Sequence, residues 1–375
     1  MEPNSRSFTL YSSTDTPSEG FPLWSPSQFI SHKDDPNACL LGDGILESGE
    51  WTSFVGLGGL GKTRLALWMS ICLITGREWL GFEPGQKRPK ITILSGENGI
   101  RRWKKDLGVM MTDLSDSERA AVDEKLLILA SIPGMDVDLC PTNPSTATRL
   151  ETTLSTAQPD LVIFDPLAEM IAGDESKTPD MLATLRSLRE VIRKSCPTAA
   201  VMIIHHGRNG AQNVSIAGDN FNAGGFGRGS KAFFSRVRCE LQLAPGDRND
   251  PRVLVLACGK TNNTEKFQAR GVVFNPETFT YSVDPSFDID VWRAKVAGDA
   301  EEAPPSLKEV LTAVRDLTSD SQMEAPRGEV KGRLIDLGAK ERTVQQRIKK
   351  ALELGLLEEG TSEKFLKLGK KGLPE

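Results

Sequence analysis

One short stretch of the chain has the residue types and spacing of a phosphate-binding loop. From Gly56 to Thr63 it reads G-x-x-x-x-G-K-T. Its glycines, which let the backbone N–H groups point at phosphate oxygens, are Gly56, Gly58, Gly59 and Gly61. Lys62 adds a positive charge, and Thr63 offers a hydroxyl to Mg²⁺. The pattern predicts a site for a nucleoside triphosphate, and a merely flexible glycine turn is the competing interpretation.

Two carboxylates follow strand-like apolar runs downstream of this loop. Asp165 comes directly after residues 161–164, an arrangement that holds Mg²⁺ in enzymes with such a loop. Glu97 comes two residues after the run 91–95 and could polarise an attacking water as a general base. The competing interpretations are an Asp that caps the turn before Pro166 and a Glu that is simply solvated at the surface.

Two of the three histidines, His205 and His206, end another apolar run, residues 201–204. A neutral imidazole at this place could sense the terminal phosphate of a nucleotide through a hydrogen bond. A histidine pair that only packs in the core or meets solvent fits the same sequence. The pair is therefore a candidate sensor.

The elements that must position these residues alternate along the chain. Over residues 21–296, strand-like runs alternate with helical patterns, which predicts an α/β fold with a mostly parallel sheet and helices on both faces. The predicted strands are residues 52–55, 91–95, 126–130, 161–164, 201–204 and 253–257. Residues 1–20 are rich in Ser, Thr and Pro and predict a disordered tail, whereas residues 297–305 predict a linker.

Composition excludes several classes of protein. The 375 residues are 38% hydrophobic, enough for one large core and a second small domain. A net charge of −5 argues against a polycation that coats nucleic acid. No apolar stretch is long enough to span a bilayer and the N-terminus is polar, so we expect a cytoplasmic protein. The six cysteines include no C-x-x-C pair, which argues against a zinc site and favours reduced thiols.

Residues 306–375 form a separate unit in the sequence pattern. Helical patterns at 307–317, 328–337 and 341–354 precede two alternating runs typical of a β-hairpin, which is the layout of a winged helix. The polar residues of the third helix are Arg342, Gln345, Gln346, Arg347, Lys349 and Lys350. From residue 305 onward the net charge is +2, against −7 for the rest. We expect this helix to bind duplex DNA, with docking to a protein as the alternative.

Several of these residues occur in the order typical of one family. The set comprises Gly56 to Thr63, Ser95-Gly96-Glu97, Asp165-Pro166-Leu167, His205-His206 and Arg228-Gly229-Ser230. Over about residues 40–265, the chain resembles the RepA-like branch of RecA-type hexameric helicases and ATPases. The resemblance implies a RecA-like core that binds ATP and Mg²⁺, and identical subunits that assemble into a ring, expected to be a hexamer.

The resemblance also implies roles for individual residues. Glu97 matches the catalytic base, and His205 or His206 matches the histidine that senses phosphate. Arg238 lies where the family has an arginine finger, which reaches the nucleotide of the neighbouring subunit. Arg236 would share its strand face in an extended segment, so the choice between the two arginines stays open.

Two further features concern the ligands. Lys260 matches a family Lys-x-Asn element near the γ-phosphate. Lys231, directly after Arg228-Gly229-Ser230, is a departure from the family, because relatives usually have a small residue at that position. The segment from Gly207 to Gly229 is rich in Gly and Asn and directly follows the histidines. We expect it to be a mobile loop that binds single-stranded DNA in the channel of the ring, with simple disorder as the alternative.

These features predict a DNA-dependent ATPase or helicase of DNA replication that hydrolyses ATP at subunit interfaces. Two alternatives stay open. One is an ATP-switched DNA-binding regulator or loader, and the other is a RecA-type recombination ATPase without unwinding activity.

Overall fold

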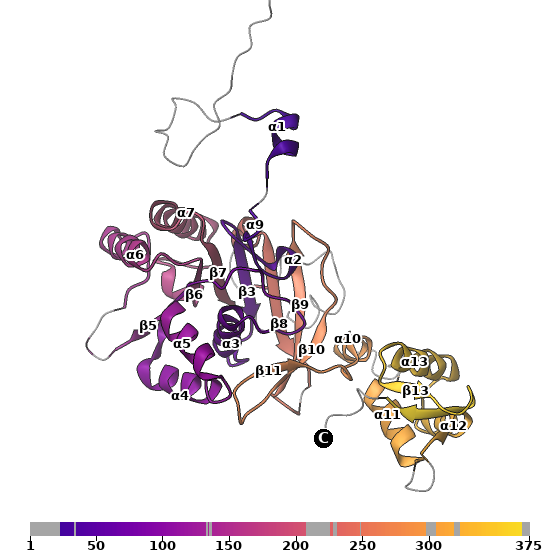
Figure 1. The fold of residues 1–375 in the computed structure, drawn as a ribbon. Coiled ribbons are helices and arrows are strands. Elements are labelled where there is room, and N and C mark those ends of the chain that lie inside the picture. Colours follow the sequence, from indigo (N-terminus) through magenta and orange to yellow (C-terminus); the bar gives the residue numbers. More distant parts are fainter. Residues whose placement is uncertain are drawn as a thin grey trace, which may run out of the picture. The chain divides into compact units, whose positions relative to one another are not determined.

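The computed structural model describes residues 23–33, 35–132, 134, 137–207, 226–227, 231–247, 249–297, 305–318 and 323–369 (Figure 1). The chain divides into two compact units, Met1–Pro36 and Asn37–Glu375. In the first unit, helix α1 (Pro26–Ser31) begins with a capping box at Ser25 and buries none of its residues. The tail predicted for residues 1–20 lies outside the described residues.

A nine-stranded sheet forms the centre of the second unit, in the order β11-β10-β9-β8-β3-β7-β6-β4-β5 (Figure 1). Its strands are β3 (Trp51–Gly56), β4 (Ile91–Gly99), β5 (Leu126–Ser131), β6 (Leu161–Asp165), β7 (Ala200–His206), β8 (Cys239–Pro245), β9 (Val253–Thr261), β10 (Arg270–Phe274) and β11 (Tyr281–Val283). From β5 to β8 all neighbours are parallel, and from β8 to β11 they are antiparallel. The predicted α/β class with a mostly parallel sheet is confirmed.

Helices cover both faces of this sheet, which is why its central strands are continuous apolar runs. One hydrophobic cluster joins Phe54 of β3 to α3 (Lys62–Thr75), α4 (Ile100–Met110) and α5 (Asp116–Lys125). Another joins Trp51 of the same strand to α6 (Pro144–Ala157), α7 (Thr178–Ser195) and α9 (Ala232–Arg236). Because side chains alternate along a strand, the two faces of β3 serve two different cores.

The remaining small elements border the sheet. Strands β1 (Cys39–Leu41) and β2 (Leu46–Glu47) form a two-stranded sheet around the short helix α2 (Gly42–Ile45). A 3₁₀ turn, η1 (Leu167–Met170), follows β6, and helix α10 (Ile289–Ala297) follows β11. Helix α10 therefore reaches the first residue of the predicted linker, and residues 298–304 lie outside the described residues.

Strand β8 was not predicted, although it lies beside the strand that leads into the phosphate loop. Its sequence includes Glu240 and Gln242, and such polar residues predict a half-solvated segment. Both side chains are nevertheless buried: the Glu240 carboxylate accepts hydrogen bonds from Gln242 Nε2 (2.7 Å) and from Ser53 Oγ (3.3 Å). Hydrogen-bond partners on β8 itself and on the neighbouring β3 allow polar groups inside the sheet.

The C-terminal residues have their own hydrophobic cluster, distinct from those of the sheet. The predicted three helices and hairpin are present as α11 (Leu307–Asp316), α12 (Arg327–Asp336), α13 (Glu341–Glu353), β13 (Leu357–Glu359) and β14 (Phe365–Leu368). A two-residue strand, β12 (Ala325–Pro326), completes a three-stranded antiparallel sheet. Gly355, just after α13, has a φ of +69°, the left-handed conformation of a helix-ending glycine.

Two further expectations concern membranes and thiols. Among the described residues, no helix is both long and apolar enough to cross a membrane. All six cysteines are free thiols, three of them buried and three partly buried, in agreement with the sequence.

Candidate functional site

The phosphate loop connects β3 to α3, and three of its four glycines are required by the structure. Gly59 and Gly61 have φ angles of +78° and +82°, which L side chains rarely adopt. Gly56 is required for a different reason, because a Cβ there would lie 2.7 Å from the carbonyl oxygen of Leu243 in β8. Since Gly61 caps α3 without a side-chain hydrogen bond, the amides of the first helical turn stay available for an anion. Strand, loop and helix follow in the predicted order.

Lys62 is the first residue of α3, and its side chain reaches back into the phosphate loop. Its Nζ donates hydrogen bonds to the carbonyl oxygens of Gly56 (2.8 Å) and Leu57 (2.6 Å). Burial lowers the pKa of this ammonium to about 8, although the charges of Asp165 and Glu97 oppose the shift. An ammonium deprived of water has much to gain from the oxygens of a phosphate.

Asp165, at the carboxyl end of β6, contacts Thr63 in the first turn of α3. Thr63 Oγ1 donates a 2.7 Å hydrogen bond to Asp165 Oδ2. Burial raises the pKa of Asp165 to about 6, the Thr63 hydrogen bond opposes that rise, and the charge of Glu97 adds to it. A desolvated carboxylate beside a hydroxyl is an oxygen-donor set that suits Mg²⁺. The residues therefore fit the predicted ion, and Thr63 and Asp165 would hold it.

Glu97 is exposed at the end of β4, and its charge acts on both Lys62 and Asp165. Asn98, its neighbour, was missed by the sequence reasoning. Asn98 Nδ2 donates to Ser95 Oγ (3.2 Å) and to Asp165 Oδ2 (3.4 Å), so it links β4 to β6. The available signal was its position directly after Glu97 in a segment already expected to hold a catalytic residue.

The two histidines lie on opposite faces of β7. In the parallel register with β3, His205 pairs with Val55 and His206 pairs with Gly56. His205 is 1% exposed and its ring stacks edge-on against Phe233, on the face away from α3. His206 lies on the other face of the sheet. Its partner in the register, Gly56, has the Lys62 side chain on that face. Only His206 therefore faces the phosphate loop.

Arg238 lies at the opposite end of the sheet from the loop. Its backbone N–H donates to the Trp51 carbonyl (2.7 Å), and its Nε lies 3.5 Å from Glu50 Oε2. Trp51 begins β3 and Gly56 ends it, so the two sites are separated by five strand residues, or about 17 Å. The Arg238 side chain is 53% exposed. It is not placed to serve the loop of its own chain.

The alternative arginine, Arg236, is not in an extended segment. Arg236 is the last residue of helix α9. It therefore does not lie on one strand face with Arg238, which was the reason for treating the two arginines as alternatives. Lys260 lies at the Arg238 end too, where its Nζ donates to the Phe234 carbonyl (3.0 Å). Burial lowers the pKa of Lys260, and the charge of Arg238 adds to that effect. The predicted site residues thus form two groups at opposite ends of β3.

The segment expected to bind single-stranded DNA can be described only at its margins. Gly207 and Gly227 form an isolated antiparallel bridge, and Phe226 is fully buried against Val55 and Trp292. Residues 208–225 and 228–230, which include the Arg-Gly-Ser element, lie outside the described residues.

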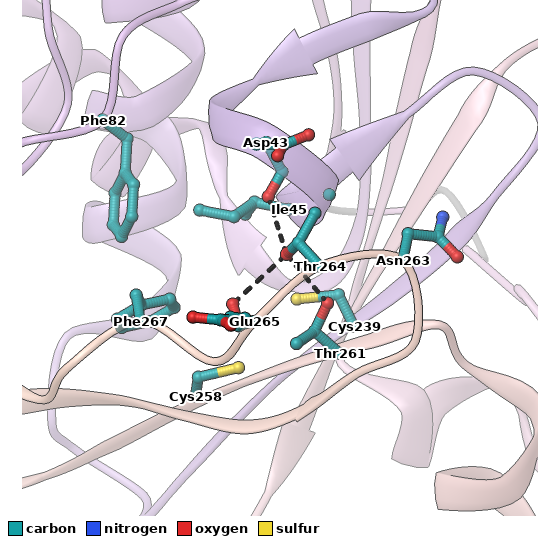
Figure 2. Close-up of a pocket in the computed structure, with 11 residues that line it drawn as sticks. Asp43, Ile45, Phe82, Cys239, Cys258, Thr261, Asn263, Thr264, Glu265 and Phe267 are labelled. Carbon is teal, nitrogen blue, oxygen red and sulfur yellow. Dashed lines mark hydrogen bonds between the residues drawn. The ribbon is translucent and has the colours of Figure 1, made fainter.

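A cavity of about 470 Å³ opens elsewhere in the sheet region (Figure 2). Cys239 of β8 and Cys258 of β9 line it, together with Asp43 and Phe82 from the segments around β1. None of its lining residues belongs to the phosphate loop. Its chemistry is separate from that of Lys62 and Asp165.

One family match covers more than half of the chain. Residues 16–212 match a protein family described as "AAA domain". No curated protein matches the chain. One similar solved structure is that of a KaiC-like protein from the archaeon Pyrococcus horikoshii OT3, with 13% identity, a TM-score of 0.44, and coverage of 67% of this chain and 98% of that chain. Another is that of the RadB recombinase, with 14% identity, a TM-score of 0.41, and coverage of 63% and 91%.

Proposed function

From the premise that the chain belongs to the AAA domain family of P-loop ATPases, we propose that it is a RecA-type enzyme that hydrolyses ATP with Mg²⁺. The observation that carries this proposal is the 2.7 Å contact between Thr63 and Asp165 beside the buried Lys62. Lys62 and the loop amides bind the phosphates, while Thr63 and Asp165 hold the ion. Bound Mg²⁺ would neutralise charge on the phosphates.

The remaining residues have assigned tasks in the same proposal. Glu97 accepts a proton from the attacking water, because its exposed carboxylate lies in the field of Lys62 and Asp165. His206, rather than His205, senses the terminal phosphate, since it alone faces the loop. Which histidine acts can be tested by replacing each with Asn and comparing ATP turnover.

We propose further that identical subunits assemble into a ring, expected to be a hexamer. Arg238 and Lys260 lie together about 17 Å from the phosphate loop of their own chain, which supports a role for both on the nucleotide of a neighbouring subunit. An arginine supplied by a neighbour stabilises the charge that develops on the transferred phosphate. Hydrolysis would then require the assembled state.

DNA is the proposed partner of this ATPase. We propose that the C-terminal unit is a winged helix that binds duplex DNA through α13. Its exposed residues Arg342, Gln345, Gln346 and Lys349 occur at i, i+3, i+4 and i+7, so they form one stripe along the helix. Arg and Gln are suited to base edges, and Lys to phosphates. Binding of single-stranded DNA by the segment after β7 belongs to the same proposal.

The ATPase rate without DNA, with single-stranded DNA and with duplex DNA tests the proposal directly. A helicase of replication is stimulated by single-stranded DNA and displaces a strand from forked DNA. Filaments on DNA without strand displacement would favour the recombination-type ATPase, and nucleotide-switched duplex binding would favour the regulator. A rate that no DNA changes, together with no DNA binding, would contradict all three.

A further inference from the structure

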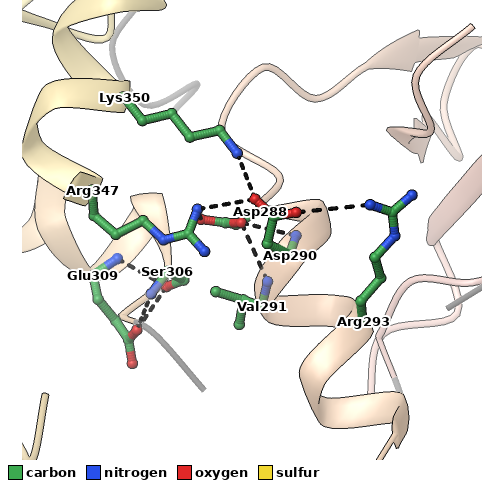
Figure 3. Close-up of polar contacts among 8 residues, drawn as sticks. All are labelled: Asp288, Asp290, Val291, Arg293, Ser306, Glu309, Arg347 and Lys350. Atoms are coloured by element: carbon green, nitrogen blue, oxygen red, sulfur yellow. Dashed lines mark hydrogen bonds and ion pairs between the residues drawn. The ribbon is translucent and has the colours of Figure 1, made fainter. Parts of the chain in front are cut away.

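Two basic residues of α13 form ion pairs with acidic residues at the start of α10, in the part of the chain that contains the nine-stranded sheet, here called the ATPase region (Figure 3). Arg347 Nη1 lies 2.9 Å from Asp288 Oδ2, and the two side chains are 7% and 1% exposed. Lys350 Nζ donates a 3.0 Å hydrogen bond to Asp290 Oδ2, which also lies 3.4 Å from Arg347 Nη1. The sequence analysis grouped Arg347 and Lys350 with the residues of α13 expected to bind DNA, and in this structure both are paired with carboxylates instead.

The two carboxylates lie at the start of α10, a helix that is bonded to the sheet. Asp288 Oδ1 accepts the backbone N–H groups of Asp290 (3.1 Å) and Val291 (3.3 Å), so this side chain caps α10. In the same helix, Trp292 Nε1 donates to the Pro245 carbonyl at the end of β8 (3.0 Å). The Trp292 ring packs with Val55, the residue before the phosphate loop. The acidic end of α10 is thus a fixed part of the ATPase region.

The ion pairs between α13 and the start of α10 contribute little net free energy to folding. Removing a guanidinium and a carboxylate from water offsets much of their mutual attraction, and apolar residues would stabilise the same junction as well or better. Burial tends to raise the pKa of Asp290, but the hydrogen bond from Lys350 and the charges of Lys350 and Arg347 outweigh it and keep the pKa low. Asp290 therefore stays charged, as a contact that can be exchanged for another ionic partner requires.

Carboxylate and phosphate oxygens offer the same bonds to a guanidinium or an ammonium group. We propose that Asp288 and Asp290 form an intramolecular docking surface that holds Arg347 and Lys350 in place of DNA phosphates. Duplex DNA and the two carboxylates compete for the same cations, while the stripe from Arg342 to Lys349 stays exposed. This inference rests on the proposed binding of duplex DNA by α13.

The salt dependence of DNA binding tests this competition. Releasing Arg347 and Lys350 adds two phosphate contacts, so the slope of log affinity against log salt becomes steeper by about 2 in the Asp288→Asn/Asp290→Asn variant. Asn still accepts the helix amides, which preserves the cap of α10. The matched control is Asp123→Asn/Glu124→Gln, which makes the same charge change at exposed positions of α5 and leaves the slope as in the unmodified protein. Equal slopes in all three proteins would overturn the inference.

A second variant separates competition from damage to the fold. The variant is Asp288→Asn/Asp290→Cys/Lys350→Cys. A reducible crosslinker joins the two introduced thiols and so connects α10 to α13, and peptide mass spectrometry verifies which cysteines are joined. The cross-linked form is expected to keep the unmodified slope, and reduction of the same sample steepens it by about 1 as Arg347 is released. No change on reduction would contradict the competition. Absence of duplex binding in every form would instead contradict the proposed function, and the inference with it.

Discussion

Lys62 and Asp165 carry opposite charges at one edge of the sheet, and burial shifts the pKa of each toward its neutral form. With pKa values of about 8 and about 6, both groups are charged only between these values. Phosphate needs the ammonium and Mg²⁺ needs the carboxylate. The residues therefore define a pH window for nucleotide binding.

Affinity for ATP at constant Mg²⁺ is expected to be highest between about pH 6 and 8. It should fall about tenfold by pH 9 as Lys62 loses its proton, and about tenfold by pH 5 as Asp165 gains one. Titration of a fluorescent ATP analogue across pH measures both limbs. Lys62→Ala should remove the alkaline limb and Asp165→Asn the acidic limb. Persistence of a limb in its own variant would contradict the assignment.

Binding and turnover should separate at single residues. Lys62→Ala is expected to abolish turnover and to weaken ATP binding more than about tenfold, because the buried ammonium is proposed to contact phosphate. Glu97→Gln is expected to retain ATP binding while turnover falls by about 10² or more, since only the proton acceptor is lost. Equilibrium binding and steady-state ATPase assays on both variants measure the two effects. Equal losses of binding would mean that Glu97 is not the base.

At the scale of elements, β8 joins two strands of the sheet and also carries a buried carboxyl group, that of Glu240. It pairs with β3 on one side and β9 on the other, and it brings the buried Glu240 carboxyl against Ser53. Burial raises the pKa of Glu240 to about 7, although hydrogen bonds from Gln242 and Ser53 oppose the shift. In the unfolded chain this group titrates near its ordinary value of 4.5.

The folded protein therefore holds this proton more tightly than the unfolded chain, and Glu240 lowers stability as pH rises from about 4.5 to about 7. Glu240→Gln removes that dependence. The variant's free energy of unfolding should rise relative to the unmodified protein by up to about 3 kcal/mol between pH 5 and pH 8. Urea denaturation at both pH values measures it. The exposed Glu358→Gln is the control, and a pH-independent difference for Glu240→Gln would count against the shifted pKa.

At the scale of the whole molecule, the proposal gives the two groups of site residues nucleotides in different subunits. Lys62, Thr63, Asp165 and Glu97 are proposed to act on the nucleotide of their own chain, and Arg238 on that of another. Two inactive proteins with different lesions should therefore restore activity to each other.

Arg238→Ala is expected to reduce ATP turnover by about 10³, as the loss of an arginine finger does. Mixing it in equal amounts with Lys62→Ala should restore about a quarter of the unmodified rate, because about one interface in four then joins an intact loop to an intact arginine. The ATPase rate as a function of mixing ratio measures this. Arg236→Ala is the matched control and should stay active. No recovery in the mixture would mean that hydrolysis needs no neighbour.

Much of the site could be predicted from residues adjacent in the sequence. The phosphate loop is contiguous, Gly59 and Gly61 meet local demands of backbone conformation, and the apolar runs before Asp165 and Glu97 indicate strands that end on the same side of the sheet. The helices and hairpin within residues 307–368 follow from local periodicity in the same way. Such features depend on interactions between near neighbours in the chain, so the sequence alone determined them.

Other features depend on contacts between distant parts of the chain. Only the register of β7 against β3 distinguishes His206 from His205, and only the pairing of β8 places Arg238 far from Lys62. The capture of Arg347 by Asp288, 59 positions earlier in the chain, likewise leaves no local pattern. The tertiary structure decided these points, because strand register and helix packing bring together side chains whose spacing in the sequence carries no record of the contact.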